Sequence, residues 1–254
     1  MTVLRASGVS VSFGGLRALV DVDLGVDEGQ LVGLIGPNGA GKTTFIDAIS
    51  GFVRCRGRVE LDGHDLSSLP PHARARRGLV RTWQSIELFD DLTVRENLAV
   101  AAQQQQSSWA TLRETVSQPL ASTPAVDQAL ALLGLEPIAG VMATDLSQAR
   151  RKLVGVARAL AAAPRLVCLD EPAAGLDSTE REELGRHLRT VVDAGTAMLL
   201  VDHDMGLVLS VCDHVVVMDF GKVIAEGPPE AVRKDAKVIT AYLGSAAAEV
   251  AEAS

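Results

Sequence analysis

One short stretch of the chain carries the strongest chemical signal. Residues 36–43 read GPNGAGKT, which matches the pattern G-x-x-x-x-G-K-[ST]. Its three glycines let main-chain nitrogens approach an anion closely, because glycine has no Cβ in the way. The stretch follows an apolar run, LVGLIG, and precedes a helical segment, TTFIDAIS, whose N-terminus favours negative charge. We therefore predict a loop that wraps the phosphates of a nucleotide.

Each part of this loop has a predicted task. The Lys42 ammonium would reach the β- and γ-phosphates, and the Thr43 hydroxyl would bind Mg²⁺. The alternative is an ordinary glycine-rich turn with a surface lysine. The predicted nucleotide-binding residues of the loop are Gly36, Pro37, Asn38, Gly39, Ala40, Gly41, Lys42, Thr43 and Thr44.

Two acids stand together at the end of a second apolar run. The segment LVCLDEP places Asp170 and Glu171 directly after a predicted strand. A strand end beside a phosphate loop suits a magnesium-associated acid, which is the role predicted for Asp170. Glu171 would face the γ-phosphate and polarise an attacking water. Pro172 predicts an extended backbone at Glu171, because a proline disfavours the helical region for the preceding residue.

Residues 145–160, DLSQARRKLVGVARAL, combine a cap, a basic run and an apolar stripe. Ser147 is a good N-cap for a helix. A capped helix N-terminus is also an anion site, so the segment suits a ligand whose other half is held elsewhere. The apolar stripe of this predicted helix consists of Leu153, Val156, Ala157 and Leu160.

The elements around these residues predict an α/β fold. Residues 1–26 contain short alternating stretches, VSVSF and LVDVDLGV, that favour antiparallel strands. Residues 214–227 favour a hairpin that turns at Phe220-Gly221. Because strands alternate with helices, the central strands are expected to be parallel. The other expected strands are 31–36, 57–63, 166–170 and 196–202.

A helical insertion is expected at about residues 92–161. TVRENLAVAA favours a helix with Thr93 as cap and Glu96 three residues later, and 125–135 favours a second helix. Between them, AAQQQQSSW and SQPLASTP are polar and low in complexity, so we expect them to be loosely ordered.

Composition narrows the class of protein. The 254 residues, 47% of them hydrophobic, suffice for one large domain or a domain with a subdomain. A formal net charge of -8 without a basic block argues against nucleic acid as the main partner. Three scattered cysteines favour reduced thiols. The sequence has neither a signal-peptide pattern at its N-terminus nor an apolar run of about 18 residues that predicts a membrane span.

Four stretches, in this order and spacing, resemble the ATPase subunit of an ABC transporter: GPNGAGKTT, LVCLDEP, AAGLDS and LLVDHD. The resemblance covers about residues 3–244. More narrowly, RTWQSIELFDDLTVRENLAVAA and GPPEAVRKDAKVITAYLG resemble ATP-binding subunits of branched-chain amino acid importers. The resemblance implies an α/β P-loop NTPase fold with a mixed central sheet, an N-terminal antiparallel β region and an inserted α-helical subdomain. One ATPase domain would span 1–244, and 245–254 would be a flexible tail.

The resemblance also implies roles for residues outside the loop. Phe13 would stack on adenine, or else belong to the ordinary core. Gln84 would contact Mg²⁺ and the attacking water and sense the membrane partner, or else be a surface amide. Asp177 would lie at a dimer interface. His203 would contact the γ-phosphate, or else be a satisfied core histidine. The implied catalytic residues are Glu171, His203 and Gln84, and the implied magnesium ligands are Thr43, Gln84 and Asp170.

The segment around Ser147 departs from the resembled family. The family's signature loop usually reads Leu-Ser-x-Gly-Gln and binds the γ-phosphate held by a second subunit, so that two chains close head to tail over ATP. Ala149 stands where the family has glycine, and Arg150 where it has glutamine. If that glycine uses a positive φ, alanine strains the loop by about 1 kcal/mol, and Arg150 would compensate in part with its charge. A weakened signature side favours a heterodimer with a different ATPase.

The function implied by the resemblance is ATP hydrolysis that powers an importer of branched-chain or other amino acids, with ATP and Mg²⁺ as cofactors. The subunit would sit peripherally on the cytoplasmic face of the cell membrane. Its implied partners are a second ATPase, transmembrane permease subunits and, indirectly, an extracytoplasmic solute-binding protein, but no nucleic acid. Three alternatives remain: a mainly ATP-binding regulatory subunit, an importer of another solute such as urea, amides or a lipid, and a soluble ABC protein of translation or DNA repair.

Overall fold

The computed structural model describes residues 1–83, 87–103 and 123–242. The predictions for Gln84, for the low-complexity stretches within 104–122 and for the tail 245–254 lie outside these residues. Within the described ranges, no helix has both the length and the apolar character that crossing a bilayer requires.

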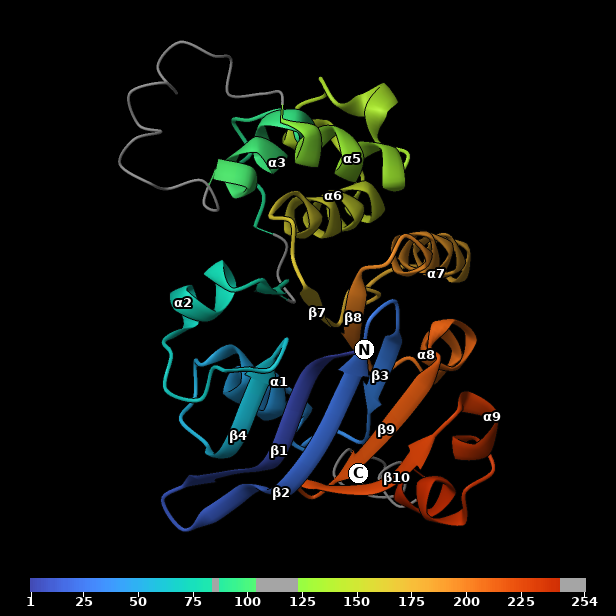
Figure 1. Ribbon diagram of the computed structural model, residues 1–254. Helices are drawn as coiled ribbons and strands as arrows, with labels where there is room; N and C mark the ends of the chain where they lie inside the picture. The colour runs from blue at the N-terminus through green and yellow to red at the C-terminus, as the bar shows by residue number, and fades with distance from the viewer. Residues whose placement is uncertain (84–86, 104–122, 243–254) are drawn as a thin grey trace.

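The N-terminal part forms a four-stranded antiparallel sheet (Figure 1). Strand β1 (Thr2–Phe13) pairs with β2 (Leu16–Asp27) on one side and with β4 (Arg56–Leu61) on the other, and β5 (His64–Asp65) follows β4. In the second half of β2, buried and exposed residues alternate strictly, as in a sheet with one face on the core. The antiparallel region predicted for residues 1–26 is therefore confirmed.

A second sheet has six strands in the order β10-β9-β3-β8-β7-β6. Only the β9–β10 pair is antiparallel, so the sheet is mixed with parallel central strands, as predicted. Strands β3, β7 and β8 are buried at every residue, because structure covers both faces of the sheet. The strands are β3 (Leu31–Ile35), β6 (Leu79–Arg81), β7 (Leu166–Asp170), β8 (Ala197–Val201), β9 (His214–Asp219) and β10 (Lys222–Gly227).

The β9–β10 hairpin turns at Phe220-Gly221, as predicted. Both residues have positive φ, 42° and 76°, which matches the right-handed twist of a two-residue hairpin. The Gly221 N–H donates to the Ala40 carbonyl at 3.0 Å, and the Val20 N–H donates to the Gly221 carbonyl at 2.9 Å. The hairpin therefore supports the back of the predicted phosphate loop.

Helix α1 (Lys42–Ser50) lies between the two sheets. Its side chains Phe45, Ile46 and Ile49 are fully buried in a cluster formed with residues of both sheets. Gly51 ends the helix with a φ of 85°, as predicted. Burial on both sides fixes the direction in which the N-terminus of α1 points.

Arg74, on the short helix α2 (Pro71–Arg76), donates hydrogen bonds to carbonyl groups at the C-terminal end of α1. Its side chain is buried, and its guanidinium donates to the carbonyls of Ala48 and Ile49 at 2.9 and 2.7 Å. It also donates to Leu69 and Ser67 carbonyls from the loop before α2. One cation thus satisfies carbonyls that the end of a helix leaves without partners.

Replacing Arg74 with methionine is expected to lower the free energy of unfolding by about 2–4 kcal/mol, because several buried carbonyls lose a charged donor. Urea denaturation followed by circular dichroism measures this change. Arg76→Met is the matched control, since Arg76 lies on the same helix but is exposed. Equal stability of the two variants would contradict the expected role of Arg74.

Three helices cover the other face of the six-stranded sheet: α7 (Ser178–Asp193), α8 (Met205–Val211) and α9 (Pro229–Val232) (Figure 1). Their apolar side chains join one cluster with those of β3, β7 and β8. None of the three was predicted individually.

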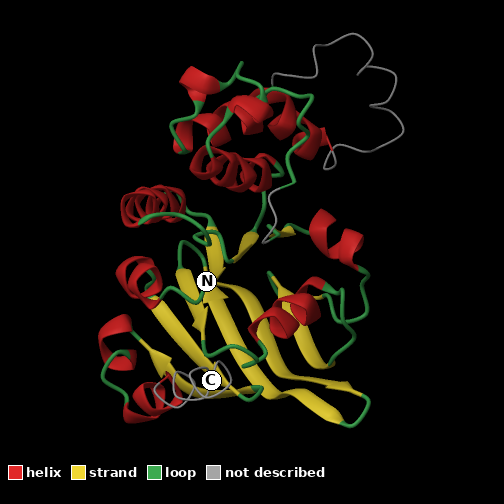
Figure 2. Cartoon of the chain, turned by 180° about the vertical axis from the view of Figure 1, so that it is seen from behind, coloured by secondary structure: helices red, strands yellow, loops and turns green. Residues whose placement is uncertain are grey.

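Beyond the strands, α3 (Val94–Gln103), α5 (Pro124–Leu132) and α6 (Gln148–Ala161) pack on one another as a separate helical group (Figure 2). Two short 3₁₀ turns, Glu136–Ile138 and Ala143–Asp145, join α5 to α6. The helix predicted at 125–135 ends earlier, because Gly134 adopts a left-handed φ of 61°. The bounds 92–161 of a helical subdomain stay a prediction.

Two helix caps in this group are confirmed. Thr93 N–H donates to the Glu96 carboxylate at 2.9 Å, and Glu96 N–H donates to the Thr93 hydroxyl at 3.3 Å. Ser147 caps α6 by accepting from the Arg150 N–H at 3.4 Å. The first turns of α3 and α6 are thus fixed by their own side chains.

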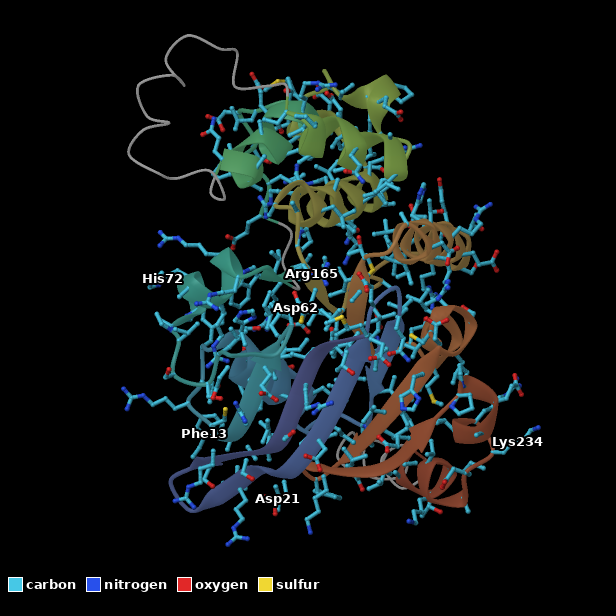
Figure 3. The ribbon with its side chains drawn as sticks, viewed as in Figure 1. Phe13, Asp21, Asp62, His72, Arg165 and Lys234 are labelled. Atoms are coloured by element: carbon cyan, nitrogen blue, oxygen red, sulfur yellow. The ribbon has the colours of Figure 1, made fainter. Side chains whose placement is uncertain are left out.

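The two sheets are also joined at the surface by an ion pair, shown in Figure 3. Arg165, just before β7, donates to both carboxylate oxygens of Asp62, just after β4, at 2.7 and 3.1 Å. Because the pair is partly exposed, its contribution to stability is modest.

Candidate nucleotide-binding site

Four parallel strands end at one edge of the six-stranded sheet. Strands β3, β8, β7 and β6 are neighbours in this order, so the loops after their carboxyl ends lie side by side. These loops begin at Gly36, Asp202, Glu171 and Thr82. Ligands of open α/β sheets bind at this kind of edge, so the fold brings most of the predicted residues together.

The glycines of the phosphate loop are required by the backbone. Gly36 and Gly41 have φ values of 153° and 100°, and a Cβ on them would lie 2.2 Å from the Met218 carbonyl and 2.9 Å from the Ala18 carbonyl. Gly39, with φ 78°, faces open space, since its Cβ would meet nothing within 4 Å. The loop is thus tight where it meets the protein and open at Gly39, which leaves room for a ligand.

Lys42 folds back over this loop. Its ammonium donates to the carbonyls of Gly36 at 2.6 Å and Pro37 at 3.0 Å, and its side chain is buried. Burial lowers the pKa of Lys42 from its ordinary value, and the Glu171, Asp202 and Asp170 carboxylates oppose this shift. The ammonium is therefore held at the mouth of the loop, close to the acidic strand ends.

Asp170 is buried at the end of β7 and pairs with Arg81. The Arg81 Nη2 donates to the Asp170 carboxylate at 2.7 Å. No role for Arg81 was predicted; the available signal was a basic residue at the end of the short apolar run LVR. Since Thr43 is exposed, the site offers a hydroxyl and one carboxylate as oxygen ligands. Mg²⁺ prefers oxygen, few protein ligands and retained waters, so these residues fit it.

Glu171 does not have the extended backbone predicted from Pro172. Its φ is 47°, in the left-handed region, while its N–H donates to the Val201 carbonyl at 2.7 Å. The prediction was wrong because the bond to β8 and the turn after β7 outweigh the local effect of the proline. A left-handed non-glycine residue stores strain, which is common at functional sites.

His203 and Asp202 follow β8 beside Glu171. His203 Nδ1 lies 3.9 Å from the Glu171 carboxylate, and the histidine side chain is 59% exposed, so it is not the core histidine of the alternative interpretation. Asp202 had no predicted role, although it is part of the quoted LLVDHD. It is fully buried and accepts from the Ala173 N–H at 3.2 Å and the Asp204 N–H at 3.0 Å. Asp202 thus fixes the loops that carry Glu171 and His203.

Phe13 ends β1, ahead of the turn Gly14–Gly15, and Figure 3 shows it away from the helical group. Its side chain is 52% exposed, so the alternative that it belongs to the core is wrong. An exposed ring is available to stack on a planar ligand, and its contact with adenine stays a prediction.

Comparison with known proteins decides the family. A family model described as ABC transporter matches residues 19–174, more than half of the chain. The chain belongs to the ABC transporter family. A second model, described as branched-chain amino acid ATP-binding cassette transporter, matches residues 222–248. As a member of this family, the chain is a nucleotide-binding ATPase whose hydrolysis of ATP is coupled to transport.

Individual relatives of this ABC ATPase match over nearly the full length. The branched-chain amino acid transport ATP-binding protein BraF of Pseudomonas aeruginosa is 39% identical, with 96% of this chain and 98% of BraF covered. LivG of Escherichia coli, with the same description, is 38% identical at the same coverage. A crystal structure of the ADP conformation of an ATP-binding cassette from an ABC transporter superposes with a TM-score of 0.82, at 31% identity and 96% and 99% coverage.

The signature side of this ABC ATPase differs from the expectation. Ala149 lies in the first turn of α6 without a positive φ, and its side chain packs against the core cluster. The backbone strain considered for this alanine is therefore absent. Arg150 is exposed. Burial lowers the pKa of His187, the Glu183 carboxylate opposes this shift, and the charge of Arg150 adds to the lowering. Asp177 is exposed and caps α7 in a reciprocal pair with Glu180.

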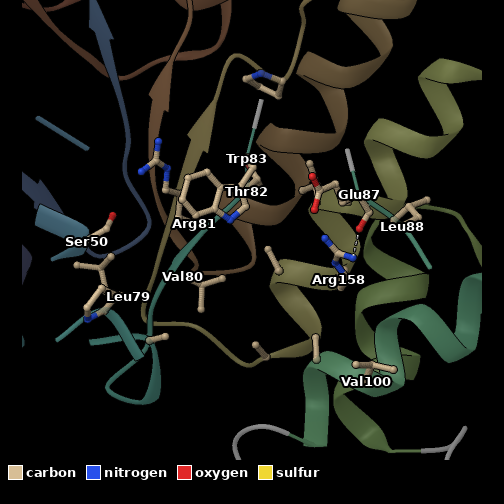
Figure 4. A pocket seen from close by; sticks show the side chains of 18 of the residues that line it. Ser50, Leu79, Val80, Arg81, Thr82, Trp83, Glu87, Leu88, Val100 and Arg158 are labelled. Atoms are coloured by element: carbon tan, nitrogen blue, oxygen red, sulfur yellow. Dashed lines mark hydrogen bonds between the residues drawn. The ribbon is translucent and has the colours of Figure 1, made fainter. Parts of the chain in front are cut away.

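The ABC ATPase also has a groove beside the site (Figure 4). A cavity of about 1130 Å³ lies between α2 and β6 on one side and α3 and α6 on the other. Three large rings on its wall, Phe52, Trp83 and Phe89, are about half exposed. Arg158 spans part of the groove by donating to the Glu87 carbonyl at 2.5 Å. Exposed rings around a hollow are typical of a surface that meets another protein.

Proposed function

We propose that this chain is the ATP-hydrolysing subunit of an importer for branched-chain or other amino acids, and that it acts on the cytoplasmic face of the cell membrane. Two observations together carry the proposal: the arrangement of the site residues and the family match of the C-terminal segment. Lys42, Asp170, Glu171 and His203 lie at one sheet edge, and residues 222–248 match the branched-chain amino acid transporter model. BraF and LivG, which bear that function in their names, support the same cargo.

In the proposed mechanism, the phosphates of ATP enter the loop at Gly39. The Lys42 ammonium exchanges its bonds to the Gly36 and Pro37 carbonyls for bonds to the β- and γ-phosphates. The amides at the N-terminus of α1 and the helix dipole hold the remaining charge. Thr43 and Asp170 would hold Mg²⁺, which neutralises developing charge on the phosphates when it is bound.

Glu171 is the proposed base. Its carboxylate takes a proton from the attacking water, while His203 binds the γ-phosphate and Asp202 keeps both loops in place. Catalysis in this arrangement comes mainly from positioning and charge neutralisation. Phe13 and Gln84 are proposed to contact the adenine and the water-magnesium centre, respectively.

A second ATPase subunit is proposed to complete each site. The N-terminus of α6 offers an anion site, since the Ser147 hydroxyl accepts from the Arg150 N–H and the first amides of a helix have no partners within the helix. The phosphates bound by one subunit would meet this end of α6 from the other. Because Ala149 and Arg150 depart from the family loop, we propose a heterodimer with an ATPase whose loop is unaltered.

The groove is proposed to receive the permease. The half-exposed rings Phe52, Trp83 and Phe89 offer an apolar lining, and Arg158 and Lys152 add positive charge. A short cytoplasmic helix of the permease fits such a surface. Closure of two subunits around ATP would then move the permease, which takes its cargo from an extracytoplasmic solute-binding protein.

Transport by the assembled complex tests the proposal. The chain, its partner ATPase and the permease are reconstituted in vesicles with the binding protein on the side opposite to the ATPases, and uptake of labelled leucine, isoleucine and valine is measured. We expect uptake that depends on ATP and Mg²⁺. Uptake of urea or short amides instead would agree with the proposed ATPase role but would contradict amino acids as the cargo.

A regulatory role is the second candidate, and the altered signature loop is what favours it. In the assembled transporter, Ala149→Gly is expected to raise ATP turnover by roughly two- to fivefold, or about 0.5–1 kcal/mol. Because the alanine is unstrained and its methyl group is only partly buried against the core, the rise would come from closer approach of the partner's nucleotide to the exposed part of that position. Release of phosphate measures the rate. An unchanged or lower rate would contradict a signature loop weakened by its methyl group.

A further inference from the structure

Arg81 lies between the nucleotide site and the groove. It ends β6 opposite Cys168 of β7, and although it belongs to the groove wall, its side chain is only 5% exposed. Its Nη2 donates to Asp170 Oδ2 at 2.7 Å, and its Nη1 donates to Asp47 Oδ1 at 2.5 Å. Asp47 belongs to α1, so one guanidinium ties the end of β7 to the helix that begins at Lys42.

Trp83 covers the guanidinium on the side of the groove. The Arg81 Cζ lies 4.4 Å from the centre of the Trp83 ring, a cation–π contact. Phe52 meets the same ring edge-on, with centres 5.0 Å apart. Figure 4 shows Trp83 on the groove wall beside Arg81. The Arg81 Nε is buried without a hydrogen-bond partner among the described residues, so two carboxylates and one ring hold this side chain.

We propose that Arg81 is a positioning residue that couples the filling of the groove to the Asp170 carboxylate. The inference rests on the role proposed above for Asp170. By binding Oδ2, Arg81 fixes the orientation of the carboxylate that would hold Mg²⁺, as outer partners do for metal ligands. A protein segment that presses on Trp83 acts on the group that holds Asp170.

The proposed coupling has a continuous series of direct contacts to run through, from Trp83 to Arg81 to Asp170. Coupling between two binding events is reciprocal. If Arg81 carries the coupling, a nucleotide that engages Asp170 is expected to change the surroundings of Trp83, even when the groove is empty.

Tryptophan fluorescence tests this effect, because the chain has two tryptophans and Trp109→Phe leaves Trp83 as the only one. In that chain, we expect MgATP to shift the emission of Trp83, and ATP with a chelator to shift it much less. Arg81→Lys keeps the charge, but an ammonium cannot span both carboxylates. We expect it to reduce the shift at least about fivefold at saturating MgATP, with saturation of each variant established by calorimetry.

Arg165→Lys is the matched control, since Arg165 also pairs with a carboxylate, Asp62, but at the opposite end of β7. It should respond like the parent chain. A full shift in a folded Arg81→Lys chain overturns the inference, and so does a parent that binds MgATP without any shift. If Arg81→Lys does not fold, Arg81→Gln replaces it, and an undiminished shift there is equally adverse. A parent that binds no MgATP refutes the proposed function itself.

Discussion

Glu171→Gln is expected to lower ATP turnover at least about 100-fold, because an amide of the same shape cannot accept the proton of the attacking water. Glutamine keeps the size of the side chain, and the left-handed backbone at this position is held by the N–H bond to Val201, which the substitution retains. Nucleotide binding should therefore persist. Phosphate release in the assembled complex measures the turnover, and gel filtration with ATP should show a closed dimer that accumulates.

Glu182→Gln is the control for this prediction, since Glu182 is an exposed acid on α7. It should hydrolyse ATP at the parent rate. Turnover within about threefold of the parent in Glu171→Gln would remove Glu171 from the role of base, because loss of a general base costs much more. If Glu171→Gln turned over ATP at the normal rate and no closed dimer accumulated, both parts of the prediction would be contradicted.

Lys42→Ala is expected to weaken MgATP binding by about 100-fold or more, because two charge-assisted hydrogen bonds to phosphate are each worth about 1.5–3 kcal/mol. In the nucleotide-free chain, the same ammonium bonds the Gly36 and Pro37 carbonyls, so some thermal stability should be lost as well. Calorimetric titration measures the affinity, and the melting temperature measures the stability.

Lys234→Ala serves as the control, because Lys234 is exposed at the far edge of the molecule, beyond α9 (Figure 3). Its affinity for MgATP should match that of the parent. If Lys42→Ala folds and still binds MgATP within about threefold of the parent, the phosphate loop does not hold the nucleotide as proposed, since a charged partner of phosphate contributes far more.

Relations between neighbours in the chain were readable from the sequence. The glycine and lysine spacing of residues 36–43 predicted the tight loop, and the structure has left-handed glycines there. Apolar runs predicted β3, β7 and β8, and the short cap patterns at Thr93 and Ser147 predicted the starts of α3 and α6. These features depend on atoms a few residues apart, so local patterns suffice for them.

What the sequence alone determined is thus the chemistry of the loop and of the strand ends, together with the elements that carry them. Tertiary structure decided the rest. Arg81 binds both Asp47, which lies 34 positions before it in the chain, and Asp170, which lies 89 positions after it. Asp202 binds the loop after β7 at Ala173, a residue 29 positions away. Tertiary structure also decided the left-handed Glu171, the inward packing of Ala149 and the groove. Such contacts depend on which strands become neighbours in the sheet, and a local sequence pattern does not specify pairing between segments that lie far apart in the chain.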